Sequence, residues 1–339
     1  MATPITRKQF LIGAGAAGAA LALRPLGADA ARPMVIKLGT PARRDDPTTK
    51  HLIAAAEAIK TATRGEVRVQ VFPNGELGND SHMLSEVRSG AIQMMGVSDF
   101  VLSVLVPSVA VDNIGFAFKN TKAAFAAMDG TVGDIVRADI VKHGLRPMPA
   151  MWDEGFREIT TSTKPIETPE DLKGFKIRVP VSPLSLSLFK DLGAAAVTMN
   201  VAELYTALQT HVVSGQENPL DIIETEKFYE VQKYCSLTNH MWGGWWMVMN
   251  GPFWKRLSAD HQKAISTAFD AQALKQRVAV EAFNNSLQGK LTSQGLKFNK
   301  PDTAPFRATL AKSGFYGYWR KTFGSELWSA LEKYTGSLA

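Results

Sequence analysis

The chain has little cysteine and no long apolar run, and both shortages narrow what it can be. Its 339 residues include one cysteine, Cys235, so an internal disulfide and any zinc or iron–sulfur site built from several cysteines are excluded. The uncharged apolar stretch at residues 10–23 is shorter than the roughly 18–20 residues that a helix needs to span a bilayer. We therefore expect no stable membrane insertion of the mature protein.

Signatures of catalysis and of nucleic-acid binding are also missing. After residue 30 the sequence has no G-x-S-x-G, Walker phosphate loop, H-E-x-x-H or C-x-x-C motif. Its six histidines are scattered without metal-ligand spacing, and its basic residues are mixed with acids. We expect no catalytic residue, no metal, no cofactor and no nucleic-acid partner.

What is present indicates an ordinary globular protein. The apolar share is 45% and the charged share 21%, which is enough for a buried core and excludes a disordered chain. The length predicts about two domains.

The first thirty residues have the pattern of an export signal rather than of a folded domain. Arg7 and Lys8 precede the apolar run of residues 10–23, and small residues surround a predicted cleavage site after Ala30. The segment TRKQFL resembles the twin-arginine translocation motif, with Lys8 in place of the second arginine. Residues 13–18 match G-x-G-x-x-G, but they lack the preceding strand that a dinucleotide site requires. Removal of residues 1–30 would lower the net charge from +6 to +4.

The rest of the chain alternates between short strands and amphipathic helices. The pattern predicts a strand at 35–39, a helix over 48–63 and a strand at 67–72, which together form a β-α-β unit. A further helix should end at Gly90, and a strand should follow at 92–97. This order is typical of an α/β architecture.

Helix starts and a helical C-terminal region complete the pattern. Thr168 and Asn200 are each followed three residues later by an acid, which predicts a capped helix start at both positions. Beyond residue 255 the sequence is helix-rich, with aromatic residues at helical spacing near the end.

Arg178 is the first candidate binding residue. In GFKIRVP, residues 174–180, apolar and basic residues alternate as in a strand, and Pro180 ends the strand. Arg178 therefore lies at the carboxyl end of a strand, where ligands bind in open α/β sheets. A guanidinium there can hold a carboxylate with two parallel hydrogen bonds.

Several long motifs resemble one family. They are WDEGFREITTSTKPIETPEDLKGFKIRVPVSP at 152–183 and MNVAELYTALQTHVVSGQENPLDIIETEKFYEVQKYCSLTNH at 199–240, supported by FPNGELGND and RSGAIQM. This sequence resembles the substrate-binding proteins of tripartite ATP-independent periplasmic (TRAP) transporters, the DctP family. The resemblance implies a periplasmic, non-enzymatic protein that captures a carboxylate-bearing organic acid and delivers it to the membrane permease.

The resemblance also implies a two-lobed α/β binding-protein fold, with a ligand cleft between the lobes and a long C-terminal helical region. Its expected divisions are an export signal (1–30), lobe I (31–154 plus 243–282), lobe II (155–242 plus 283–310) and C-terminal helices that pack across both lobes (311–339).

By position in the family's motifs, the resemblance implies a set of ligand contacts. Arg178 would form the central salt bridge to the ligand carboxylate, Arg157 would lie near it, and Asn218 would hydrogen-bond to it from a turn between Gly215 and Pro219. The variable pocket positions fall at Thr40, Ser98, Trp152, Val201 and Trp242.

A charged loop, four tryptophans and the function itself each allow more than one interpretation. The charged loop Arg43–Asp46 is either solvent-exposed or in contact with the ligand. Trp245 and Trp246 are expected to pack in the core, whereas Trp152 and Trp242 are candidates for lining the pocket. The alternative functions are a twin-arginine-exported periplasmic oxidoreductase and a hydrolase that uses Asp153 or Glu154 as a base.

Overall fold

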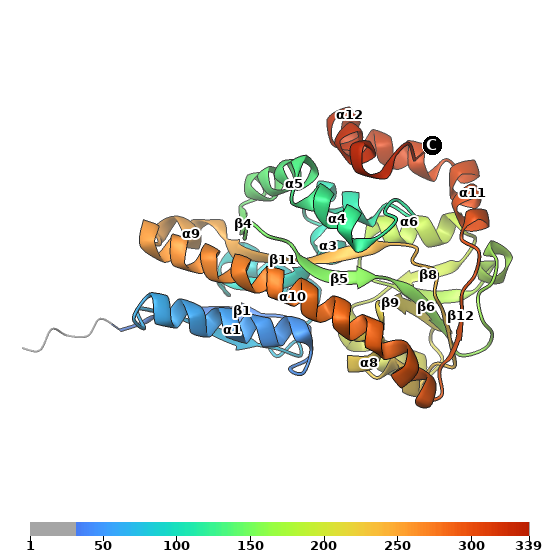
Figure 1. Cartoon of the computed structure of the whole chain (residues 1–339), viewed down its shortest axis with the longest axis horizontal. Helices are drawn as coiled ribbons and strands as arrows, with labels where there is room; N and C mark the ends of the chain where they lie inside the picture. Colours follow the sequence, from blue (N-terminus) through green and yellow to red (C-terminus); the bar gives the residue numbers. More distant parts are fainter. Residues whose placement is uncertain (1–31, 339) are drawn as a thin grey trace, which may run out of the picture. The chain divides into compact units, whose positions relative to one another are not determined.

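The computed structural model describes residues 32–338, which carry two mixed β-sheets surrounded by helices (Figure 1). The predicted export signal at 1–30, its cleavage site and the G-x-G-x-x-G run lie outside the described residues. Within the described part, no helix has the length and apolarity needed to cross a membrane.

The first sheet has the strand order β2-β1-β3-β11-β4, with β5 pairing to β11. Its strands are β1 (Met34–Gly39), β2 (Val67–Phe72), β3 (Met94–Ser98), β4 (Leu145–Pro147), β5 (Trp152–Phe156) and β11 (Trp242–Asn250). The predicted β-α-β unit is confirmed, because β1 and β2 are parallel and the helix α1 (Pro47–Ala62) connects them. Strand β11 runs antiparallel to β3, β4 and β5.

The second sheet has the order β12-β10-β6-β9-β7-β8. Its strands are β6 (Glu158–Thr161), β7 (Lys176–Val179), β8 (Ala195–Thr198), β9 (Gly215–Asn218), β10 (Tyr234–Ser236) and β12 (Lys297–Asn299). The chain passes from the first sheet to the second at Arg157, the one residue between β5 and β6, and returns between β10 and β11.

Helices cover both sheets. They are α2 (Asp80–Ser89), α3 (Asp99–Leu102), α4 (Thr121–Met128), α5 (Thr131–Lys142), α6 (Pro183–Asp191), α7 (Leu204–Gln209), α8 (Leu220–Thr225), α9 (Gly251–Arg256), α10 (Ala259–Ser293), α11 (Ala304–Ser313) and α12 (Phe315–Thr335), with 3-10 turns η1 (Pro107–Asn113), η2 (Pro169–Leu172), η3 (Val201–Glu203) and η4 (Phe228–Glu230). The 35-residue α10 packs beside α1 and reaches α8, so it contacts elements connected to both sheets (Figure 1). The predicted capping box at Thr168 is present at the start of η2.

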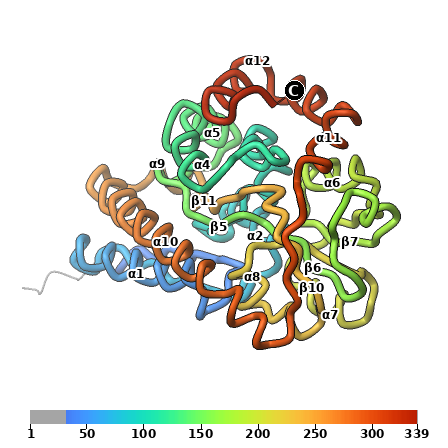
Figure 2. The backbone as a smooth tube through the Cα atoms, turned by 45° about the vertical axis from the view of Figure 1, so that its right-hand side comes forward, coloured from blue at the N-terminus to red at the C-terminus, as the bar shows by residue number. Residues whose placement is uncertain are grey.

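The apolar core has three clusters that hold these layers together. The largest joins β3 and β11 to β7, α6 and the C-terminal helices, the second lies between β1, α1 and α10, and the third surrounds α7, α8 and β10. Helix α12 packs on α4, α5 and α6 (Figure 2). Its buried aromatic side chains, among them Trp319 and Trp328, belong to the largest apolar cluster.

Candidate ligand-binding site

Arg178 is a buried guanidinium that has no carboxylate partner in the described part of the chain. On β7 the neighbouring Ile177 and Val179 face the largest apolar cluster, which leaves Arg178 on the opposite face with 2% of its surface exposed. Its Nε and Nη2 both donate to the Met199 carbonyl oxygen, at 2.9 and 2.6 Å. Among residues 32–338 no carboxylate lies within ion-pair distance of it. Burial lowers the pKa of Arg178 to about 10, although Glu217 and Asp80 act in the opposite direction.

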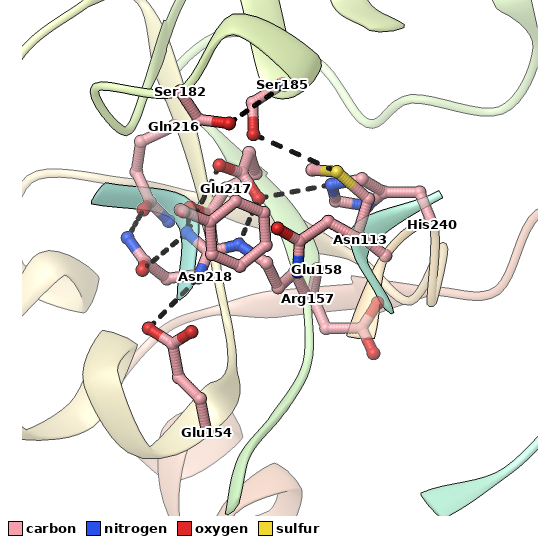
Figure 3. Close-up of polar contacts among 12 residues, drawn as sticks. Asn113, Glu154, Arg157, Glu158, Ser182, Ser185, Gln216, Glu217, Asn218 and His240 are labelled. Carbon is pink, nitrogen blue, oxygen red and sulfur yellow. Dashed lines mark hydrogen bonds and ion pairs between the residues drawn. The ribbon is translucent and has the colours of Figure 1, made fainter. Parts of the chain in front are cut away.

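Arg157 is buried as well, but the protein neutralises its charge (Figure 3). Its Nε donates to Glu217 Oε2 at 2.5 Å, and its Nη1 lies 3.3 Å from Glu154 Oε1. Burial lowers the pKa of Arg157, but attraction to Glu217 and Glu154 outweighs this effect and raises it. The charge of Glu217 is held in turn by His240 Nε2, 3.2 Å from Glu217 Oε2. Arg157 thus belongs to a buried network that has no unpaired positive charge.

Asn218 connects this network to the cavity. Its Oδ1 accepts from Arg157 Nη2 at 2.8 Å, and its Nδ2 donates to Gln216. The expected turn around Asn218 is wrong, because Asn218 is the last residue of strand β9 and pairs with Glu158 on β6. Gly215 instead allows β9 to lie close to β6, because a Cβ at this position would be 2.5 Å from the Thr160 carbonyl oxygen.

A small cavity of about 40 Å³ lies between the two sheets at these residues. Its lining consists of Pro41, Asp80, Ser98, Val101, Glu154, Arg157, Arg178, Pro180, Val201, Asn218, Ile222 and Trp245. The structure thus brings together five of the predicted contacts, namely Arg178, Arg157, Asn218, Ser98 and Val201. The other three, Thr40, Trp152 and Trp242, are buried outside this lining.

Two of the four tryptophans, the candidates for lining the pocket, pack in the core instead. Trp242 packs edge-on against Phe125 in the largest apolar cluster, with ring centroids 5.1 Å apart, and Trp152 packs in the second cluster. Trp245 and Trp246 both belong to the apolar clusters, as expected, and Trp245 also lines the cavity. The reason is the pairing of the strands: Trp245 on β11 stands opposite Ser98, at the carboxyl end of β3, and this end faces the cavity.

A β-bulge brings Glu154 to the cavity. In the pairing of β5 with β11, Gly155 is opposite Gly243 and Asp153 is opposite Gly244, so Glu154 has no partner on β11. An extra residue of this kind redirects its side chain. Ser98 Oγ donates to Glu154 Oε2 at 3.0 Å. Burial raises the pKa of Glu154 to about 8, while the nearby Arg157 lowers it.

Asp80 is the second acid of the lining, and it was not expected there. It is the first residue of α2 and is 4% exposed. Burial raises the pKa of Asp80 to about 6, while the charge of Arg178 and the backbone N–H of Val201 lower it. In the sequence Asp80 belongs to the polar run FPNGELGND, whose composition indicates only a turn and a helix start.

Two polar contacts link the first-sheet side of the cavity to the second. Asn200 does not cap the following helix as predicted; its Oδ1 instead accepts from Ser81 N at 3.3 Å and Ser81 Oγ at 3.0 Å. Arg43 Nη2 lies 2.7 Å from Glu226 Oε2. In the loop Arg43–Asp46, Arg43 is thus ion-paired, and Asp46 caps α1 by accepting from Thr48 N.

No metal centre accompanies these groups: among residues 32–338, no three His, Cys, Asp or Glu side chains are grouped so that they could hold a metal ion. The arrangement offers one unpaired guanidinium, two carboxyl groups and apolar walls around a single cavity.

Comparison with known proteins identifies the family. The family model DctP, described as "Bacterial extracellular solute-binding protein, family 7", matches residues 38–314. The chain is 36% identical over 236 residues to the 2,3-diketo-L-gulonate-binding periplasmic protein YiaO of Escherichia coli (strain K12), covering 69% of this chain and 71% of YiaO. It is 33% identical over 259 residues to the C4-dicarboxylate-binding periplasmic protein DctP of Rhodobacter capsulatus, covering 76% of each.

A solved structure indicates the same family and confirms the predicted fold class. The crystal structure of the sugar acid binding protein DctPAm from Advenella mimigardefordensis strain DPN7T, in complex with galactonate, superimposes with a TM-score of 0.86. The identity is 31%, and the match covers 91% of this chain and 99% of that chain. The chain belongs to the DctP family of TRAP periplasmic solute-binding proteins, a family of non-enzymatic binding proteins.

Proposed function

We propose that this chain captures a small organic acid through its carboxylate group, with Arg178 as the primary contact, and delivers it to the permease of a TRAP transporter. The observation that carries the proposal is the charge of Arg178, which is buried and has no carboxylate within ion-pair distance among residues 32–338. A buried charge without a partner costs several kcal/mol. A ligand carboxylate would offset this cost.

The geometry leaves Arg178 able to bind a carboxylate with two hydrogen bonds. A guanidinium has five N–H donors, and two of those of Arg178 are directed at Met199. The remaining donors can form a charge-assisted pair of bonds, each contributing about 1.5–3 kcal/mol. Arg157 has a different proposed role: its donors already contact Glu217 and Asn218, so it would fix Asn218 beside the ligand.

We further propose that the protein closes around the ligand as two lobes, residues 31–154 plus 243–282 and residues 155–242 plus 283–310, with helices 311–339 packed across both. In this proposal each sheet belongs to one lobe, and the strand crossings at Arg157 and before β11 act as hinges. The contacts Ser81 to Asn200 and Arg43 to Glu226 would then form on closure. Thr40, Trp152 and Trp242 would support the pocket from behind its lining.

A thermal-shift screen tests the proposal. Hydroxy acids, uronates, dicarboxylates and aromatic acids are added to the purified protein, and a ligand at 100 times its dissociation constant should stabilise it by about 2.7 kcal/mol. Arg178→Ala should abolish the shift. Arg68→Ala, which removes an exposed arginine on β2, should leave it intact. An undiminished shift in Arg178→Ala would refute the proposal.

A further inference from the structure

The cavity contains a second buried charge without an ion-pair partner, the carboxylate of Asp80. Asp80 is 4% exposed and lines the cavity together with Arg178. Among residues 32–338 no Lys or Arg side chain lies within 4.0 Å of its carboxylate oxygens, and this includes Arg178. Two opposite charges therefore share one small cavity without pairing to each other.

The segment from Met199 to Val201 contacts both of these charged groups. Met199 accepts both donors from Arg178 through its carbonyl oxygen, Asn200 accepts from Ser81 beside Asp80, and the Val201 N–H stabilises the Asp80 carboxylate. One short stretch of chain thus holds a cation and an anion that both face the same space. Such an arrangement suits a ligand with a carboxylate at one end and a hydrogen-bond donor elsewhere.

We infer that Asp80 accepts a hydrogen bond from a hydroxyl group of the ligand, so that the site selects hydroxylated monocarboxylates and rejects dicarboxylates. The inference rests on the proposed function, in which Arg178 holds the ligand carboxylate. An ionised carboxylate is an acceptor only, and it therefore requires a donor from the ligand. A second ligand carboxylate would instead meet like charge in a desolvated site, which is strongly unfavourable.

Two further observations narrow the donor to a hydroxyl. The Val201 N–H and the charge of Arg178 already stabilise the Asp80 carboxylate. Its remaining lone pairs therefore suit a neutral donor rather than a second full positive charge. Glu154 provides a second carboxyl group on the same lining, and Ser98 Oγ donates to it. Several hydroxyl groups along one carbon chain can satisfy such distributed acceptors.

Calorimetric titration with acids matched in length tests the inference. The four-carbon set is D-erythronate, butyrate, succinate and 2-aminobutyrate, and the six-carbon set is D-galactonate, hexanoate and adipate. Each is titrated at pH 7 into the wild-type protein and into Asp80→Asn. The control is Asp260→Asn, which removes the same charge from an exposed position at the start of α10.

In the wild type, the hydroxy acid of at least one set should bind at least tenfold more tightly than the other acids of that set. Asp80→Asn should weaken it at least tenfold, as expected for a lost charge-assisted hydrogen bond. The same variant should bind the dicarboxylate of that set at least threefold more tightly than the wild type does, a gain that misfolding cannot produce. Asp260→Asn should match the wild type.

Tighter binding of succinate, adipate or 2-aminobutyrate than of the hydroxy acid would overturn the inference, and so would unchanged affinities in Asp80→Asn. The proposed function would survive either result, provided that binding still required Arg178. No binding by any of these acids would overturn the inference, while the broader acid screen would still decide the proposed function.

Discussion

The two buried arginines of the site should respond differently to the same substitution. Arg157 is ion-paired to Glu217 and Glu154, whereas Arg178 has no carboxylate partner within residues 32–338. Arg178→Met and Arg157→Met each keep a long apolar side chain and remove the charge. Stability is compared in the ligand-free protein, because no ligand carboxylate then offsets the buried charge of Arg178.

For Arg178 two effects nearly cancel. Burial lowers its pKa from 12.5 to about 10, and at ~1.4 kcal/mol per pKa unit the charged form costs the folded protein about 3 kcal/mol. Arg178→Met removes this cost but leaves the Met199 carbonyl without its two donors, a loss of about 1–3 kcal/mol. The free energy of unfolding should therefore change by less than about 2 kcal/mol.

For Arg157 nothing offsets the loss. Arg157→Met leaves the carboxylate of Glu217 and the acid Glu154 buried without their cation. Removing one partner of a buried ion pair typically costs about 3–5 kcal/mol. Thermal unfolding followed by circular dichroism at pH 7 should show a melting temperature lower by on the order of 10 °C for Arg157→Met, and a small change for Arg178→Met. Equal destabilisation by the two substitutions would refute the distinction between them.

Two further predictions concern closure and pH. Arg43→Ala removes the 2.7 Å ion pair with Glu226; because a partly exposed pair contributes about 0.2–1 kcal/mol, ligand affinity measured by calorimetry should fall by up to about fivefold. Lys60→Ala, which removes a pair within α1, should have no effect, and equal affinities in the two variants would argue against the closing role. Burial raises the pKa values of Glu154 and Glu158 from 4.5 to about 8. Between about pH 5 and 8 the folded protein therefore holds protons that the unfolded chain releases. The free energy of unfolding should fall as the pH rises through this range. Melting temperatures of the ligand-free protein should show this fall with a smaller slope in Glu154→Gln, and a slope unaffected by that substitution would contradict the assignment.

The family, the fold class and the position of Arg178 could be predicted from the sequence. The strand and helix periodicities predicted the β-α-β unit correctly, because these elements are local and amphipathic. Arg178 could be placed in the same way, since alternation and Pro180 fix its strand end. The family was predicted from the long sequence motifs.

The acids of the cavity could not be predicted, because tertiary contacts create them. Glu154 faces the cavity through a bulge that exists only when β5 pairs with β11, strands 86 or more residues apart in the chain. Asp80 lies in a polar run, and it becomes buried only where Asn200 and Val201 pack against the start of α2. The division of the tryptophans had the same cause: Trp245 faces the cavity because of its place in the sheet.

A crystal structure of the complex with the acid that stabilises the protein most would show whether Arg178 holds the ligand carboxylate while Arg157 stays with its protein partners. We expect both carboxylate oxygens within about 3 Å of the Arg178 guanidinium, with Arg157 still bonded to Glu217. A carboxylate bound elsewhere, or one held by Arg157 while Arg178 contacts only Met199, would contradict this expectation.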